Sequence, residues 1–159
     1  MSLENSDAPD FTLDSTAGEP VTLSETLETG PTVVLITRGH WCSFCAEQLQ
    51  TFSDVSDDLW FNDGVDVLSS RDGLGRQTHR DARPVDLDIQ LLSDPDGDVA
   101  ESYSGTEETS RGTTGVAATF VVDDDGVVQY EQIADHPGDR THGNFVRYFI
   151  RNDFADPFA

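Results

Sequence analysis

The sequence predicts an α/β domain in which a mixed central β-sheet is flanked by helices. Short apolar runs of strand-like composition recur along the chain. One of them, residues 32–37, leads into a helical stripe of apolar residues, and the strand–helix pattern is followed by a hairpin signal and a closing helix. A length of 159 residues suits one well-cored domain. We therefore expect a single domain over residues 1–159, with the polar residues 1–8 loose.

A small hairpin and a short helix are predicted before the central strand. Residues 10–14 and 20–23 alternate apolar and polar side chains on either side of a glycine-containing turn, which is typical of paired strands. Ser24 offers an N-cap for a helical segment over 25–29, and Gly30-Pro31 ends that segment. The chain then enters the apolar strand.

The helix after the central strand can be placed from its apolar spacing. Intervals of four, three, three and four residues put five side chains on one helical face: Cys45, Leu49, Phe52, Val55 and Leu59. Gly64 ends this helix. Strands are predicted at 65–69 and 89–92, and the polar, Arg-rich residues 73–83 between them are expected to form an exposed helix or loop.

The last part of the chain contains a second hairpin signal and a closing helix. A helix is predicted over 98–103, and the Gly-, Ser-, Thr- and Glu-rich residues 104–115 predict a long loop that is either mobile or functional. Strands over 118–122 and 127–131 flank an Asp-Asp-Asp-Gly turn. The closing helix, over about 141–151, has three aromatic residues on one face: Phe145, Tyr148 and Phe149.

The charge of the chain limits its partners. There are 31 acidic and nine basic residues, every base is Arg, and the formal net charge is −22. Such a surface repels nucleic acid and anionic membranes, so we expect neither as a partner. The acidic residues are spread along the chain as in proteins of salt-loving organisms, where molar salt screens charge beyond about 3 Å. A mildly acidic mesophilic protein is the alternative, which the absence of lysine disfavours.

The sequence shows no signal peptide and no membrane span, and these absences set the expected cellular location. No N-terminal basic stretch precedes an apolar core, and no run approaches the roughly 18 apolar residues of a membrane span. We expect a cytoplasmic protein, in which a stable structural disulfide would be unusual.

The two cysteines, Cys42 and Cys45, lie where the central strand gives way to the helix, and they admit three interpretations. A structural disulfide closing so small a ring would contribute only about 2 kcal/mol. A tetrahedral zinc site would need histidines in a His-x3–5-His pattern, whereas His136 and His142 are six residues apart. We therefore expect no metal and no other cofactor, and the third interpretation is redox chemistry.

Redox chemistry needs a thiolate near neutral pH. A free cysteine has a pKa of about 8.5, and a site that lowers it to about 7 makes half of the thiol ionised. The start of a helix favours this ionisation through its unpaired N–H groups and dipole. Cys42 sits at that start and Cys45 one turn later on the buried stripe, so the two sulfurs can bridge. Cys42 is predicted to be the exposed attacker and Cys45 the shielded resolver, although the order stays open for a peroxidase.

Residues around the cysteines have both functional and ordinary interpretations. Arg38 could hold a thiolate or an anionic leaving group, or be a plain surface residue. Trp41 could form a substrate platform or pack at the rim of the core, and His40 could tune the thiolate or be an exposed loop residue. Glu47 and Gln48 are expected to be ordinary first-turn helix residues, favourable to the dipole.

Four segments carry a family likeness: Ala8-Pro9-Asp10-Phe11-Thr12-Leu13, Val21-Thr22-Leu23-Ser24, the strand running into Trp41-Cys42-Ser43-Phe44-Cys45, and Ala118-Thr119-Phe120-Val121-Val122-Asp123 with Gly126. They resemble the peroxiredoxin-like branch of the thioredoxin superfamily, the alkyl hydroperoxide reductase and thiol-specific antioxidant family. The cysteine segment is similar to members with Arg-Gly-x-Trp-Cys-Pro-x-Cys. The resemblance covers roughly residues 8 to 131. It implies a thioredoxin-like fold with an N-terminal β-hairpin extension, and thiol-dependent reduction of peroxides or disulfides.

The sequence departs from that family at the positions around the reactive cysteine. The family places Pro and Thr seven and three residues before the peroxidatic cysteine. These positions are Arg38 and Cys42 if Cys45 is that cysteine, and Leu35 and Gly39 if Cys42 is. Neither register carries Pro-x3-Thr-x2-Cys.

Two further family positions differ. The peroxide-activating Arg usually stands just before the strand that begins here at Ala118, where this chain has none, and Arg111 is the nearby candidate to substitute for it. Ala117 occupies the place of the thioredoxin cis-proline, and Ser43 replaces the common Pro between the cysteines.

These observations predict a cytoplasmic, peroxiredoxin-like thiol oxidoreductase that reduces peroxides through a dithiol–disulfide cycle of Cys42 and Cys45. Substrate-binding candidates are Arg38, Trp41 and Arg111. The expected partners are a peroxide or disulfide substrate and a thiol reductant such as a thioredoxin-type protein, and relatives often associate, which allows a homodimer. A thioredoxin-like protein disulfide reductase, a thiol-based metal-binding or metal-delivery module and a redox-silent fold are the alternatives.

Overall fold

Strand β3 (Thr32–Ile36) is an interior strand of the main sheet and is buried along its whole length. The computed structural model describes residues 2–15, 18–38, 43–59, 66–71, 90–94, 97–109, 112–136 and 138–151. Within them β3 pairs in parallel with β4 (Asp66–Arg71) and in antiparallel fashion with β8 (Ala118–Val122). Cover on both faces explains why the sequence of β3 is almost continuously apolar rather than alternating.

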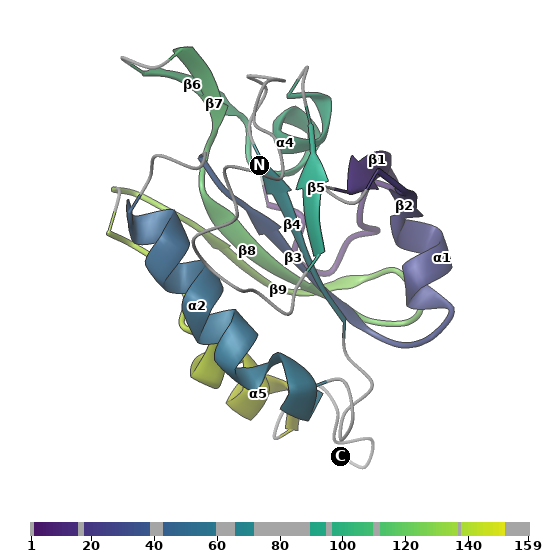
Figure 1. The fold of residues 1–159 in the computed structure, drawn as a ribbon. Helices are drawn as coiled ribbons and strands as arrows, with labels where there is room; N and C mark the ends of the chain where they lie inside the picture. Colours follow the sequence, from purple (N-terminus) through teal and green to yellow (C-terminus); the bar gives the residue numbers. More distant parts are fainter. Residues whose placement is uncertain are drawn as a thin grey trace.

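The main sheet has seven strands in the order β2-β1-β5-β4-β3-β8-β9 (Figure 1). The remaining strands are β1 (Thr12–Ser15), β2 (Pro20–Thr22), β5 (Gln90–Ser93) and β9 (Val128–Ile133). The β4–β5 pair is parallel, whereas β1–β2, β1–β5 and β8–β9 are antiparallel. The predicted mixed sheet and both predicted hairpins are therefore confirmed.

Helices cover both faces of this sheet (Figure 1). They are α1 (Leu23–Leu27), α2 (Ser43–Asp58), α4 (Asp98–Tyr103) and α5 (Gly143–Phe149). Val34 and Ile36 of β3 point into a core layer closed by α1 and α4, and Val33 and Leu35 point into a layer closed by α2 and α5. Successive side chains of a strand alternate between faces, so one apolar strand supports both layers. None of the described helices has the length and apolar composition to cross a membrane.

The two helices of the second layer are placed by different side chains. All five residues of the predicted stripe, from Cys45 to Leu59, are buried, which confirms the phase of α2. Helix α5 buries Val146, and Ile150 at its C-cap is buried as well. Phe145 and Phe149 of α5 stack on each other, with ring centroids 6.4 Å apart, whereas Tyr148 is exposed. The predicted helix is thus present, but aliphatic residues rather than its aromatic ones fill the core.

The start of α1 differs from the expectation. Ser24 does not cap this helix; Thr22 occupies the N-cap position and makes no side-chain capping bond. The first-turn N–H of Ser24 instead donates to Oδ1 of Asp10 at 2.9 Å. A carboxylate from the preceding loop satisfies the same unpaired donor that a local cap would satisfy, so the sequence pattern around Ser24 was misleading.

Residues 104–115 do not form the long loop that their composition suggested. Strands β6 (Thr106–Thr109) and β7 (Gly112–Gly115) form a separate two-stranded antiparallel sheet. The pattern was missed because the hairpin has no apolar residue, and its regularity comes from backbone pairing. A Cβ at Gly115 would lie 2.8 Å from that of Ala100, so glycine is required where the hairpin meets the core.

The N-terminal segment contacts the β8–β9 hairpin. Asn5 and Ala8 donate backbone hydrogen bonds to the carbonyl oxygens of Val128 and Gly126, both at 2.8 Å. Asp7 forms an isolated bridge with Val127. These contacts join residues 5–8 to the β8–β9 hairpin, and the expectation of a loose segment over residues 1–8 stays a prediction. The segment 73–83, expected to be an exposed helix or loop, lies outside the described residues.

Candidate active site

The sulfur of Cys45 is the centre of the candidate site. Cys45 lies in the first turn of α2 and is 1% exposed. Its Sγ accepts a hydrogen bond from the backbone N–H of Arg38 at 3.2 Å and from Nη1 of Arg140 at 3.5 Å. Two donors aimed at one sulfur favour its anionic form, because a hydrogen bond to the charged state stabilises that state.

The fold explains how Arg38 reaches this sulfur. Strand β3 ends at Ile36, and Arg38 follows two residues later, beyond the pairing with β4 and β8. Its N–H is therefore no longer used by the sheet and can donate to the adjoining end of α2. The side chain of Arg38 faces a different partner: its Nε lies 3.7 Å from Oε2 of Glu107 on β6.

Arg140 reaches the sulfur from a distant part of the sequence. It belongs to the segment between β9 and α5, 95 residues after Cys45. The next residue, Thr141, is buried and held at three points. Its carbonyl oxygen accepts from Nε2 of Gln48 at 3.0 Å, and its hydroxyl bonds with Gln132 Oε1 and Tyr130 OH, both at 3.1 Å. The backbone that carries Arg140 is therefore fixed to α2 and to β9.

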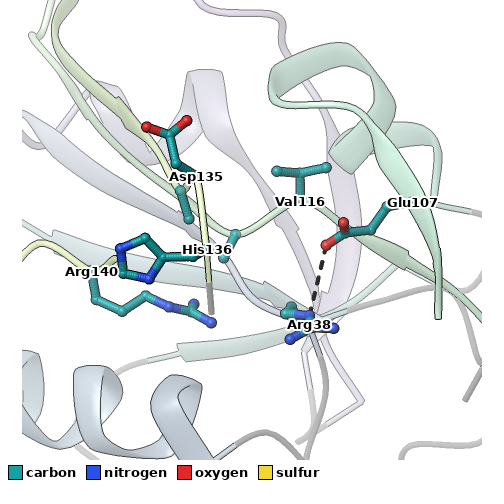
Figure 2. A pocket seen from close by; sticks show the side chains of 8 residues that line it. Arg38, Glu107, Val116, Asp135, His136 and Arg140 are labelled. Carbon is teal, nitrogen blue, oxygen red and sulfur yellow. Dashed lines mark ion pairs between the residues drawn. The ribbon is translucent and has the colours of Figure 1, made fainter. Parts of the chain in front are cut away.

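A small cavity adjoins the two arginines (Figure 2). Its volume is about 120 Å³. The lining residues are Arg38, Glu107, Val116, Ala117, Ala134, Asp135, His136 and Arg140. Figure 2 shows the Arg38–Glu107 ion pair on one side of this cavity and Arg140 with His136 on the other. Two of the nine basic residues of a strongly acidic chain thus meet beside one sulfur.

Potential metal ligands gather elsewhere in the described part of the chain. Asp123, Asp124 and Asp125 place carboxylate oxygens within 4.8 Å of one another in the β8–β9 turn. The carboxylate of Asp123 accepts bonds from the N–H groups of Asp125 and Val127 and from Nε2 of Gln129. These bonds give Asp123 a role in shaping the turn, so the cluster has an explanation without an ion.

The structure brings together part of the predicted site and adds residues to it. Cys45 and Arg38 meet as described above, whereas Cys42, Trp41 and Arg111 lie outside the described residues. Gln48, expected to be an ordinary first-turn residue, is 4% exposed and donates to Thr119 Oγ1 as well as to Thr141. This is a correction: one helical turn after Cys45, Gln48 connects three segments of the fold.

Arg140, Glu107 and His136 were missed by sequence reasoning. No motif or spacing connects Arg140 to a cysteine 95 residues away. The one available signal was the rarity of basic residues, because each Arg in a chain of net charge −22 is a candidate for a specific task. That signal does not choose among nine arginines.

Comparison with known proteins gives a family and a fold. The model of the AhpC/TSA family matches residues 5–131. No curated protein sequence matches the chain at a significant level.

Solved structures resemble the whole chain. Peroxidoxin BcpB from Mycobacterium tuberculosis has a TM-score of 0.83 and 21% identity, over 96% of this chain and 99% of that one. AhpC from Enterococcus faecalis has a TM-score of 0.79 and 19% identity, over 99% and 96%. The reduced 2-Cys peroxiredoxin of Plasmodium vivax has a TM-score of 0.74 and 12% identity, over 98% and 99%. At these identities the similarity confirms the thioredoxin-like fold.

Proposed function

The chain belongs to the AhpC/TSA family and is a thiol-dependent oxidoreductase, and we propose that it reduces peroxides through a dithiol–disulfide cycle of Cys42 and Cys45. The observation that carries the proposal is the sulfur of Cys45, which accepts N–H groups from Arg38 and Arg140, two residues that also line a small cavity. A thiolate is the species that attacks peroxides, and a hydrogen bond donated to the sulfur stabilises that charged form.

The cavity favours a small substrate. The cavity of about 120 Å³ beside Arg38 and Arg140 has room for a small molecule such as a hydroperoxide. A protein disulfide would need contact between one of its sulfur atoms and a cysteine sulfur of this chain, and Cys45 is 1% exposed. Burial at this sulfur therefore supports a peroxide over a protein disulfide as its substrate.

The cycle is balanced by two thiols and one external reductant. Attack by a thiolate on one peroxide oxygen breaks the O–O bond, forms a sulfenic acid and releases an alcohol or water. The second thiol then displaces water from the sulfenic acid and forms a disulfide. An external dithiol, such as that of a thioredoxin-type protein, restores both thiols by exchange and is itself oxidised.

We further propose that the protein acts as a single domain in the cytoplasm, at molar salt. The acidic, lysine-free composition supports activity at molar salt, and the reducing cycle suits the cytoplasm. Association into a homodimer is part of the proposal, and light scattering in molar salt tests it.

The experiment mixes reduced protein with hydrogen peroxide in a stopped-flow instrument, in molar salt. Tryptophan fluorescence is followed because Trp41 adjoins Cys42 in the sequence. We expect a change faster than the reaction of free cysteine in the same buffer, ending in one intramolecular disulfide for each peroxide consumed. The double variant Cys42→Ser, Cys45→Ser is the control. A wild-type rate no greater than that of free cysteine contradicts the proposal.

A further inference from the structure

We propose that Glu107 selects the peroxide by charge: its carboxylate offsets the positive charge of the cavity and disfavours peroxides that carry a negative charge. This inference rests on the proposed function and names the substrate class of that site, a small uncharged hydroperoxide. It also gives a task to the β6–β7 hairpin, whose two strands have no apolar side chain and lie outside the main sheet.

The first argument is the charge of the residues around the cavity. Two arginines line it, Arg38 and Arg140, and both donate to Sγ of Cys45. Among the described residues two carboxylates, Glu107 and Asp135, belong to the same lining. Two arginines alone would attract any small anion, whereas the formal charges of the four side chains cancel. The lining as a whole therefore suits an uncharged molecule.

The second argument concerns which carboxylate offsets the positive charge. Oε2 of Glu107 lies 3.7 Å from Nε of Arg38. Figure 2 shows this carboxylate turned toward the guanidinium group, whereas the carboxylate of Asp135 points away from it. A separation of 3.7 Å exceeds that of a hydrogen bond, so Glu107 acts on this guanidinium group through its charge.

The third argument is the exposure of the two charged side chains. The side chain of Glu107 is 46% exposed and that of Arg38 is 18% exposed. The carboxylate therefore lies on the solvent side of the ion pair. An anion that enters here meets a like charge before it reaches the guanidinium group, and an uncharged peroxide does not. The same exposure lets water and salt screen the carboxylate, so the expected selectivity is moderate.

The fourth argument is that the backbone carrying Glu107 is fixed to the body of the domain. The preceding residue, Thr106, donates from its hydroxyl to Oε1 of Glu101 on α4 at 3.0 Å. At the base of the hairpin the N–H of Val116 donates to the carbonyl oxygen of Gly105 at 2.9 Å. A charge held in one place acts on every arriving substrate in the same way, as a specificity-determining residue must.

The test compares two small oxidants that differ in charge. Hydrogen peroxide is uncharged at neutral pH, and peroxymonosulfate is a singly charged anion. Reduced wild-type and Glu107→Gln proteins are mixed with each oxidant in a stopped-flow instrument, in molar KCl. The quantity of interest is the rate constant for peroxymonosulfate divided by that for hydrogen peroxide. We expect Glu107→Gln to raise this ratio about tenfold, because one unit charge within a few ångströms of the substrate is removed.

Two further variants separate the local charge from the net charge of the chain. Successive residues of a strand point to opposite faces, and the carboxylate of Glu108 accepts a hydrogen bond from the hydroxyl of Thr113. Glu108→Gln removes the same charge from the hairpin and is the matched control, which should keep the wild-type ratio. Glu107→Asp keeps the charge beside Arg38 and should also stay close to the wild-type ratio.

The outcomes distinguish this inference from the proposed function. A ratio in Glu107→Gln that equals the wild-type ratio would overturn the selection by charge, and so would equal shifts in Glu107→Gln and Glu108→Gln. Both results leave the peroxidase function intact. A wild-type protein that reacts with hydrogen peroxide no faster than free cysteine would remove the proposed function, and the inference with it. Melting temperatures of all variants are recorded in the same buffer, so that loss of fold is recognised directly.

Discussion

Gln48 donates from Nε2 to the carbonyl oxygen of Thr141 at 3.0 Å, across 93 residues of sequence. The same nitrogen donates to Oγ1 of Thr119 on β8 at 3.0 Å. One amide group therefore joins the helix of Cys45, the central sheet and the segment of Arg140. Because its donors are used inside the protein, removal of this side chain leaves two buried acceptors with fewer partners.

We predict that Gln48→Ala lowers both stability and peroxide reactivity. Loss of the buried amide should reduce the free energy of unfolding by about 1–3 kcal/mol. The rate of peroxide reduction should fall as well, because the anchor of Arg140 is weakened. Urea unfolding and stopped-flow kinetics measure the two effects. Gln50→Ala is the matched control, since Gln50 is exposed, donates to Asp54 on the same helix and should be nearly neutral. Equal effects of both substitutions would contradict the prediction.

Gly143 is predicted to tolerate no side chain. A Cβ at this position would lie 2.5 Å from the backbone oxygen of Thr51, so α5 would have to move away from α2. Overpacking of this kind costs about 1–3 kcal/mol. Gly143→Ala should therefore lower the melting temperature. Gly138→Ala is the comparison, because its Cβ would meet side chains at ordinary contact distance, Phe44 at 3.4 Å and His136 at 3.7 Å. A melting temperature of Gly143→Ala that matches wild type would show that the helices separate without cost.

Tyr103 is predicted to make the fold sensitive to alkaline pH. Burial, with a smaller contribution from the charge of Asp10, raises the pKa of this phenol. The folded state therefore keeps the proton more tightly than the unfolded chain, whose tyrosines titrate at about 10. The resulting stability is fully present below about pH 10 and is lost as the pH rises further towards the folded-state pKa.

The corresponding experiment follows urea unfolding between neutral and strongly alkaline pH. Tyr103→Phe should lose about 1 kcal/mol at neutral pH, because the hydroxyl donates to the carbonyl oxygen of Pro9 at 2.6 Å. Above about pH 10 its stability should fall less steeply than that of wild type. Tyr148→Phe, at a residue 63% exposed, should follow the wild-type curve. Parallel curves for wild type and Tyr103→Phe would remove Tyr103 as the cause.

Salt is predicted to stabilise the fold strongly. With a formal net charge of −22, self-repulsion acts against the compact state, and molar salt reduces its range to about 3 Å. The melting temperature should rise steadily from dilute buffer to molar KCl. Sucrose at matched osmolality is the control for effects unrelated to charge. A melting temperature that responds to sucrose as it does to KCl would mean that charge screening is not the cause.

The sequence was most informative where apolar residues repeat. The stripe from Cys45 to Leu59 and the apolar runs of β3 and β8 each bury a regular set of side chains, so their periodicity predicted both element and face. The β6–β7 hairpin was missed because backbone pairing, which leaves no periodic trace in Thr, Glu and Gly, defines it.

Only the residues of the candidate site that lie close together in the sequence could be predicted. The order of residues from Arg38 to Cys45 places a strand end beside a helix start, and this local pattern indicated a thiol site. The contacts of Arg140, Thr141 and Gln48 join positions more than 90 residues apart. Such contacts depend on how β9 and α5 return to the sheet, which no spacing in one sequence reports.

The distance in sequence between Cys45 and Arg140 has a consequence during synthesis. A ribosome adds about 5–20 residues per second, so a growing chain carries its cysteine for several seconds before Arg140 exists. Over that interval the thiol has neither the guanidinium nor the packing of α5 beside it. The pair of donors at the sulfur of Cys45 is therefore complete only when the C-terminal segment docks, and the environment of this thiol is a property of the finished molecule.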